Sequence, residues 1–588
     1  MTDSRILGAT HDATTSGSRA NDDAGRPFRV AGGRHAGGYW IDIPTLLIAG
    51  GAFFIGVILW LDNAQGGLTG NGIMKAKQLT PWIIDPAHAP LDPSNYLFFP
   101  AYGALCRVLD LLGLWAGDPR RQIALLNALS ASLCLCVVYL LVRHITGRRI
   151  LALLAALFHL ACYDVLVLAV INEDIMSSYT VMFSSMALAA IWFARPTALR
   201  VCVVAAIFTI GWLFEWRLMF PTLPAMLAAL WLCEKRPTIR VAWIALFAGA
   251  MLATTAVVAL AWHGHAGAVG VTGLLWTGKG VGSSWGGFTW PKVVYLFDGM
   301  TGYLLGAGMI TIADFPGGWD VWRITGLTMI VAAAAASIAI LWRARSSTQA
   351  WALAAVFGGT FLAGEVMNFY SQPQDPQMQI NVMGWLTLGA ALIAGDIWRR
   401  RGPAGPRLLA AVSIALLANS LWSLTPVRGA DTNWRLAVER IKKVADPTRT
   451  VFLLHDFEWS SSYFRSLGAT PEPGIADLAA APTPSPPIRW IGLIATLLRH
   501  PDWSPDKHAE ALKAEIERAR SLGYDVVTVR VWTDTLPELL SETGMVADAD
   551  RIGALYRVLH DSFVGVRLLD DATAGSVYRL EPKDRAGK

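Results

Sequence analysis

Long apolar runs divide most of this chain into segments of membrane-spanning length. A helix needs about 20 apolar residues to cross the hydrocarbon core of a bilayer. Eleven runs before residue 425 reach or approach that length. The predicted spans are 43–61, 122–143, 150–171, 177–194, 199–214, 217–233, 241–262, 321–342, 350–369, 379–397 and 407–424. The two shortest, on either side of Phe214–Arg217, are also compatible with a hairpin that enters and leaves by one face.

The composition agrees with an integral membrane protein. Of the 588 residues 54% are hydrophobic and only 16% are charged, whereas about a quarter of a soluble domain is charged. The 25 tryptophans fit because indole rings favour membrane interfaces. A formal net charge of +5 is too small to indicate a nucleic-acid partner. The six cysteines show neither metal-ligand nor disulfide spacing. We expect no cofactor.

The short loops predict the orientation in the membrane. Basic residues gather in alternate connections, which are "RHITGRR" (143–149), "RPTALR" (195–200), "CEKRPTIR" (233–240), "WRARSS" (342–347) and "WRRRGPAGPR" (398–407). The positive-inside rule places all five, and the N-terminus, in the cytoplasm. The other connections then face outward, and an odd number of spans puts the chain after about residue 425 outside. We therefore expect a multi-pass protein of the inner (plasma) membrane with a periplasmic or extracellular C-terminal domain.

Three parts follow from these patterns. Residues 1–41, rich in Gly, Ser, Asp and Arg, are expected to be a disordered cytoplasmic tail, 42–425 a transmembrane domain, and 430–588 an extracytoplasmic domain. The transmembrane domain has two long outer loops, 62–121 and 263–320. In the first, "NYLFFPAYGALCRVLDLLGLW" is predicted to lie along the membrane interface. In the second, the apolar segment 293–312 is either a pair of interfacial helices or a further span.

The last part of the chain alternates between predicted helices and strands. "TNWRLAVERIKKVA" reads as a helix and "RTVFLLHDF" as a strand. "SPDKHAEALKAEIERARSLG" has a Ser N-cap and a Gly stop, and the strand "YDVVTVRVW" follows it. "FVGVRLLDD…GSVYRLEP" is predicted to be a closing hairpin. This alternation predicts a small α/β domain, without a Gly-rich phosphate loop, a nucleophile elbow or a metal cluster.

Acidic residues recur at the outward-facing ends of the predicted spans. Candidate site residues are Asp62 at the end of the first span, Glu173 and Asp174 in "INEDIMSS", Glu215 and Arg217 in "FEWR", and Tyr370, Asp375 and Gln377 in "FYSQPQDPQMQIN". Lys75 and Lys77 follow in the first outer loop. Asp164 is predicted to lie inside the membrane, where a charge is costly and marks a candidate functional residue. If the outer ends converge, they form a polar cavity beneath the soluble domain.

Each of these residues also has a purely structural interpretation. Glu173 and Asp174 are then solvated helix caps, and Glu215 and Arg217 simply pair with each other. Asp375 in "PQDP" then serves the turn alone, and Lys75 and Lys77 anchor the chain at the interface. No His/Asp cluster suggests a tightly bound metal, although a divalent ion is compatible with the chemistry considered next.

The order of these elements resembles the GT-C superfamily of polyprenyl-phosphate-sugar-dependent glycosyltransferases. A span ending in an acid leads to an outer loop with "DPSNYLFFPAYGALCRVLDLLG", then to "LLNALSASLCLCVVYLLVRHITGRR" and, after another span, to "INEDIMSSYTVMFSSMALA". Protein O-mannosyltransferases and the bacterial enzymes that add sugars to lipid A belong to this superfamily. The resemblance is strongest over 43–235, and continues to 424 as a pattern of spans.

The resemblance implies roles for particular residues. Asp62 matches the catalytic acid of the first outer loop, and Glu173 or Asp174 matches a second acid. Arg217 and Lys75 are candidates for the donor phosphate, with Lys77, Glu215, Tyr370, Asp375 and Gln377 as further donor- or substrate-binding candidates. O-mannosyltransferases carry an Asp-Glu pair where this chain has Asp62 followed by Asn63, which argues against a close protein mannosyltransferase.

The expected function is hexosyl or pentosyl transfer from a polyprenyl-phosphate donor, in contact with membrane lipids, to a hydroxyl of a lipid, glycan or protein. Asp62 would act as general base in an inverting single displacement. The alternatives are a transporter or flippase of lipid-linked glycans, and a non-catalytic protein of envelope assembly. Against transport, the sequence has no internal repeat or paired broken helices of the kind that transporters show.

Overall fold

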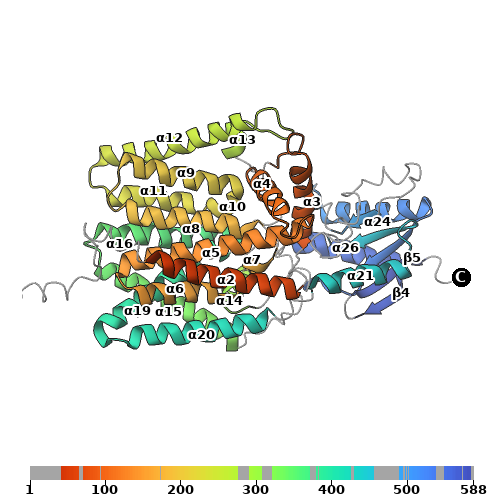
Figure 1. Cartoon of the computed structure of the whole chain (residues 1–588). Coiled ribbons are helices and arrows are strands. Elements are labelled where there is room, and N and C mark those ends of the chain that lie inside the picture. The colour runs from red at the N-terminus through yellow and green to blue at the C-terminus, as the bar shows by residue number, and fades with distance from the viewer. Residues whose placement is uncertain are drawn as a thin grey trace, which may run out of the picture.

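The structure, a computed structural model, is a long helical bundle with a small α/β domain at one end (Figure 1). It describes residues 42–64, 70–92, 95–171, 174–275, 290–306, 321–370, 379–381, 383–424, 430–455, 489–493, 497, 500, 502–537, 548–571 and 574–583. We call the end of the bundle beside the α/β domain the domain end. The opposite end carries the five basic loops and is called the basic end.

Each predicted span coincides with one helix or with consecutive helices. These are α2 (Ile43–Ala64), α5 (Pro119–Thr146), α6 (Arg149–Ala161) with α7 (Tyr163–Val170), α8 (Ile175–Trp192), α9 (Ala198–Phe214), α10 (Trp216–Met219) with α11 (Thr222–Cys233), α12 (Pro237–Ala261), α15 (Val321–Arg343), α16 (Thr348–Leu353) with η4 (Ala354–Gly358) and α17 (Gly359–Tyr370), α19 (Gly384–Arg401), and α20 (Ala404–Ser423). Within the described residues, seven helices are long and apolar enough to cross a membrane, or eight if α6 and α7 form one span. The chain is thus a multi-pass helical membrane protein.

The predicted span 150–171 is bent. Helices α6 and α7 meet at 71°, because Cys162 has an extended backbone (φ −61°, ψ 129°) that interrupts the helical hydrogen bonds. The hydroxyl of Ser420 in α20 donates to the carbonyl of Ala161 (2.7 Å), which satisfies a carbonyl group at the helix end. Asp164, in the first turn of α7, is fully buried within the protein.

The basic loops lie together at one end of the bundle, as predicted. Arg149 pairs with Asp42 at the start of α2 (2.6 Å), and the Arg148 guanidinium lies 4.2 Å from the centroid of the Trp398 ring. Cys233 Sγ donates to Thr348 O (3.5 Å). Gln349 Nε2 donates to Ala190 O (2.5 Å). These contacts lie at the basic end of the bundle, where the loops gather (Figure 1).

The first outer loop forms two helices at the domain end, α3 (Gly70–Ile84) and α4 (Phe98–Leu111) (Figure 1). One face of α4 buries Phe98, Tyr102 and Cys106. Its other face leaves Val108 and Leu111 exposed. An apolar residue on the outer face of a helix beside a membrane contacts lipid at low cost, so α4 agrees with the predicted interfacial helix. The second outer loop contains the short helix α13 (Val271–Leu275), and it reaches the first where Leu91 N donates to Ala266 O (2.7 Å).

The segment 293–312 begins as a single helix, α14 (Trp290–Leu305). It packs against α7, α15, α17 and α20, and its 16 residues are shorter than a typical span. Lys292 in its first turn is fully buried and donates to the carbonyl of Tyr370 (3.3 Å). Burial raises the pKa of Asp548 in the α/β domain, and the hydrogen bond and charge of Arg551 and the more distant charge of Lys292 oppose this rise. The α/β domain therefore lies against the ends of α14 and α17.

The α/β domain consists of α21 (Ala430–Val444), β1 (Thr450–Leu454), β2 (Arg489–Gly492), α24 (Pro505–Ser521), β3 (Asp525–Val529), α26 (Ala549–Ser562), β4 (Phe563–Asp571) and β5 (Gly575–Pro582). Its sheet has the order β2-β1-β3-β5-β4. Strand β1 is parallel to β2 and β3, and the predicted closing hairpin is the antiparallel pair β4–β5. Ser504 caps α24 as predicted, because its hydroxyl accepts from Lys507 N (3.3 Å). The sequence did not predict β2 or α26.

Candidate functional site

Five polar residues from separate segments meet at the domain end of the bundle. Lys75 lies on α3, Asn95 precedes α4, Asp174 precedes α8, and Glu215 and Arg217 lie at the junction of α9 and α10. We call this group the outer polar cluster. Asn95, Asp174 and Glu215 are each exposed by less than 5%. Burial of two carboxylates is costly unless both are paired and hydrogen-bonded, and the contacts below meet that requirement.

The ammonium of Lys75 pairs with the carboxylate of Asp174. Lys75 Nζ lies 2.6 Å from Asp174 Oδ2, and the two side chains are exposed by 16% and 6%. Lys75 also donates to Asn95 Oδ1. The rings of Phe98 and Phe99, with centroids 5.7 Å and 5.3 Å from Nζ, cover the ammonium on one side. Lys75 is therefore a largely buried ion-pair partner of Asp174.

Asn95 joins the two acidic residues. Its Nδ2 atom donates to Asp174 Oδ2 (2.7 Å), to Glu215 Oε2 (3.0 Å) and to the carbonyl of Phe214 (3.0 Å). Only this orientation of the amide matches its neighbours, because an ammonium must meet the amide oxygen and carboxylates must meet the amide nitrogen. Asn95 thus links the first outer loop to α8 and to the α9–α10 junction.

Arg217 forms the most exposed edge of the cluster and pairs with the buried Glu215. Arg217 Nε and Nη2 donate to Glu215 Oε1 (2.8 Å) and Oε2 (3.1 Å), so the contact is bidentate. The backbone N–H of Arg217 also donates to Oε1 (3.2 Å). The pairing predicted as a structural alternative is therefore present. The Glu215 side chain is 1% exposed but that of Arg217 is 45% exposed, so the guanidinium reaches solvent from a buried, fixed partner.

Asp174 carries a stable negative charge. Burial of its carboxyl raises the pKa, but the nearby charges of Lys75 and Arg217 and the hydrogen bond from Lys75 outweigh burial and place the pKa below its ordinary value. The carboxylate also lies at the N-terminus of α8, where the helix dipole favours negative charge. Asp174 is consequently ionised at neutral pH. It is not the solvated cap of the structural alternative, because only 4% of the residue is exposed.

Neighbouring polar contacts hold the cluster in place. The hydroxyl of Tyr102 donates to Asn127 Oδ1 (2.7 Å), and Asn127 Nδ2 donates to the carbonyl of Ile171 (2.9 Å), shortly before Asp174. On the opposite side, Leu97 N donates to Leu213 O (2.9 Å). These hydrogen bonds tie α4 to α5, α7 and α9, so the segments that carry the cluster are fixed by side chains outside it.

The other predicted site residues are placed only in part. Asp62 lies in the last turn of α2, and α2 ends at the domain end of the bundle (Figure 1). Lys77 lies on α3, but the side chains of Asp62 and Lys77, and the whole of Glu173, Asp375 and Gln377, fall outside the described residues. Within the described residues, Tyr370 makes no hydrogen bond or ring contact with the cluster, and its carbonyl accepts from Lys292.

The sequence prediction missed Asn95. Asn95 lies in "DPSNY", within the outer-loop stretch that resembles the GT-C superfamily. An uncharged amide in a loop gives no signal of its own. In the described residues no group of three or more His, Cys, Asp and Glu side chains is arranged to hold a metal ion. What the cluster offers chemically is one half-exposed guanidinium and two carboxylates, held by an ammonium and an amide at the membrane boundary.

No protein-family model matches the chain, and no curated protein sequence does. Among solved structures, the fold is similar to ArnT from Cupriavidus metallidurans bound to undecaprenyl phosphate, with a TM-score of 0.45 and 14% identity over 91% of this chain and 97% of that one. The same protein in its apo state has a TM-score of 0.45 and 14% identity, over 92% of this chain and 98% of that one.

An oligosaccharyltransferase of Archaeoglobus fulgidus, in complex with Zn and sulfate, is also similar. Its TM-score is 0.44 and its identity 11%, and the match covers 88% of this chain and 69% of that one. The likeness to these three structures extends over most of this chain. At such identities and TM-scores, it specifies neither an activity nor the residues of a site.

Proposed function

We propose that this protein is a membrane glycosyltransferase of the GT-C type. It would transfer a hexosyl or pentosyl group from a polyprenyl-phosphate donor to an acceptor hydroxyl at the outer face of the membrane. The observation that supports this most directly is the outer polar cluster, in which charged and polar residues from four segments converge where the apolar bundle meets the α/β domain. A lipid-borne donor and an acceptor from the aqueous side would meet at this boundary.

Arg217 is proposed to bind the phosphate of the donor. Its guanidinium is half-exposed and is held by Glu215 through two hydrogen bonds, and a guanidinium matches the geometry of phosphate oxygens. Glu215 would then be a positioning residue for Arg217. Lys75 and Asp174 would act mainly as a structural pair, because each already has its charge balanced inside the cluster.

Asp62 is proposed to be the general base. The acceptor O–H would lose its proton to Asp62 as the oxygen attacks the anomeric carbon. The bond from that carbon to the phosphate oxygen would break, polyprenyl phosphate would leave, and the configuration would invert. General-base catalysis contributes typically 10²–10⁴-fold, and a cation beside the leaving phosphate stabilises the charge that develops there. The residues Glu173, Lys77, Asp375, Gln377 and Tyr370 remain proposals for substrate contacts.

The proposed orientation follows the basic loops. The basic end would face the cytoplasm, and the outer polar cluster and α/β domain would face the periplasm or the cell exterior. The acceptor, whether lipid, glycan or protein, would then approach between α3, α4 and the α/β domain. The α/β domain lies beside this entrance, where it would bind the acceptor or cover the site.

The test is donor consumption by purified protein in nanodiscs, because this readout does not require the acceptor to be known. Undecaprenyl-phosphate hexose and pentose donors are offered with a membrane extract as the acceptor source, and released undecaprenyl phosphate is measured by chromatography. We expect Asp62→Asn and Arg217→Ala each to lower the rate at least 100-fold. Matched controls are Asp85→Asn and Arg120→Ala, since both side chains are exposed on the same side of the protein, outside the cluster.

Full activity of both Asp62→Asn and Arg217→Ala would refute the proposed roles. Protein-dependent movement of an intact lipid-linked sugar across the bilayer, without release of undecaprenyl phosphate, would favour the flippase. Absence of both release and movement with every donor offered would favour the non-catalytic alternative.

A further inference from the structure

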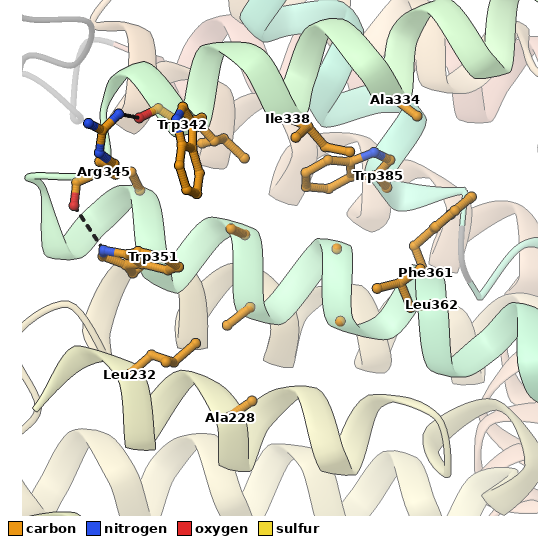
Figure 2. A pocket seen from close by; sticks show the side chains of 16 residues that line it. Ala228, Leu232, Ala334, Ile338, Trp342, Arg345, Trp351, Phe361, Leu362 and Trp385 are labelled. Carbon is orange, nitrogen blue, oxygen red and sulfur yellow. Dashed lines mark hydrogen bonds between the residues drawn. The ribbon is translucent and has the colours of Figure 1, made fainter.

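An apolar groove opens between helices far from the outer polar cluster. It has a volume of about 400 Å³ and lies between α11, α15 and the continuous stretch α16–η4–α17 (Figure 2). Alanine and glycine residues, among them Ala228 and Ala334, leave space that larger residues would fill. Indole rings of Trp342 and Trp351 flank one end. In Figure 2 these two rings lie at the same end of the groove as Arg345.

The length of the groove matches one half of a bilayer. Along α16–η4–α17 its lining extends from Ala350 to Leu362, which is about 18 Å at 1.5 Å per helical residue. The hydrocarbon core of a membrane is about 30 Å thick. An extended chain in this groove would therefore span about one leaflet. Helix α16 lies at the basic end of the bundle (Figure 1), so the leaflet is the one beside the basic loops.

Arg345 gives the mouth of the groove a positive charge. Its guanidinium lies 5.0 Å from the centroid of the Trp342 ring, and its Nη1 donates to the Trp342 carbonyl (3.4 Å). The indole of Trp351 donates to the Arg345 carbonyl (2.8 Å) and so fixes the backbone there. Within the described residues no carboxylate pairs with Arg345. The nearby Arg343, Arg399 and Arg400 instead share Asp396, at 3.7, 2.8 and 2.9 Å.

We propose that this groove is a binding site for an anionic phospholipid. One acyl chain would lie in the groove, the phosphate would contact Arg345, and the two indoles would lie at the headgroup level, which tryptophan favours in membranes. The charge of the mouth argues for an anionic headgroup. Under the proposed function the donor phosphate binds at the outer polar cluster, at the opposite end of the bundle, so the sugar donor would not occupy this groove. The site is independent of the proposed transfer reaction.

The experiment compares lipid retention by the full-length protein and four variants. Protein is reconstituted in nanodiscs of equal parts dioleoyl phosphatidylglycerol and dioleoyl phosphatidylcholine, released, and analysed by native mass spectrometry. Ala334→Phe fills the groove, and Ala335→Phe is its control on the exposed face of the same helix. Arg345→Gln removes the charge at the mouth, and Arg343→Gln is its control at the end of α15, outside the groove lining.

We expect the wild type and both controls to retain phosphatidylglycerol in preference to phosphatidylcholine. Ala334→Phe and Arg345→Gln should each weaken that retention about tenfold, as expected for loss of a charge-assisted contact or of the chain site. Equal retention of the two lipids by the wild type would overturn the proposal, and so would equal retention of phosphatidylglycerol by all five proteins. Either result would mean that the bound lipid is unspecific bulk lipid. Displacement of phosphatidylglycerol by added undecaprenyl phosphate would also overturn it, since the groove would then bind polyprenyl chains.

Discussion

Lys75 and Asp174 are 99 residues apart in the chain, yet Lys75 Nζ lies 2.6 Å from Asp174 Oδ2. This ion pair joins α3 of the first outer loop to the start of α8, and Asn95 extends it to Glu215. The pair is largely buried, so its two members depend on each other.

Removal of one member of the pair should destabilise the protein more than removal of both. Lys75→Met leaves the buried Asp174 carboxylate with Asn95 as its remaining side-chain hydrogen-bond donor, and loss of one partner of a buried pair costs about 3–5 kcal/mol. We expect the thermal midpoint in detergent to fall clearly for Lys75→Met and to recover in part for Lys75→Met with Asp174→Asn. Arg120→Met, which removes a partner of the exposed ion pair with Asp118, should cost at most about 1 kcal/mol. A double variant less stable than the single one would contradict the pairing.

Asn95 should be sensitive to charge rather than to size. Asn95→Leu removes the donor shared by Asp174 and Glu215, and an unsatisfied buried acceptor costs about 1–3 kcal/mol. Asn95→Asp has nearly the same shape but places a third carboxyl beside the two acids, so it should be the less stable variant at neutral pH. Thermal midpoints at pH 7 and pH 5 measure this, with Gln78→Leu on the exposed face of α3 as control. Equal stability of Asn95→Asp and wild type would contradict the bridging geometry.

The pKa of Asp174 predicts a loss of stability in acid. Because the folded pKa lies below the ordinary value of 3.8, the carboxylate stabilises the fold fully above that value. This contribution disappears as the pH falls below 3.8 and through the folded pKa. Since Lys75 is the main cause of the low pKa, Lys75→Gln should flatten this part of the profile. Thermal midpoints between pH 6 and pH 3 test it, and parallel curves for both proteins would exclude the assignment.

Gly103 should be intolerant of even one methyl group. A Cβ atom at this position of α4 would lie 2.6 Å from Trp82 Cβ and 3.1 Å from Trp82 O on α3. Gly103→Ala must therefore push α3 away from α4 and displace Lys75 from Asp174. We expect a lower thermal midpoint and lower transferase activity. Gly249→Ala in α12, where a Cβ meets nothing within 4 Å, is the matched control and should raise helix stability slightly. Equal effects of both substitutions would disprove the close α3–α4 contact.

The architecture of the membrane part could be predicted because the bilayer imposes its requirements locally. Each span needs about 20 apolar residues in succession, and the charge bias of short loops is visible in the loops themselves. The helix 505–521 and the β4–β5 hairpin were predicted from Ser504 at the cap and from local strand patterns. Strand β2 has four residues, too few for such a pattern, and α26 was not recognised.

The outer polar cluster was predicted only as a set of residues. Asp174, Glu215, Arg217 and Lys75 were recognisable from the sequence because charges at the ends of apolar runs stand out. Only the tertiary structure decided that Lys75 pairs with Asp174 and that Asn95 joins both acids. The physical reason is that these contacts join segments 79 to 120 residues apart, where no local periodicity or propensity records the partner. At the bend, the carbonyl of Ala161 likewise accepts from Ser420 of α20, which lies far away in the sequence.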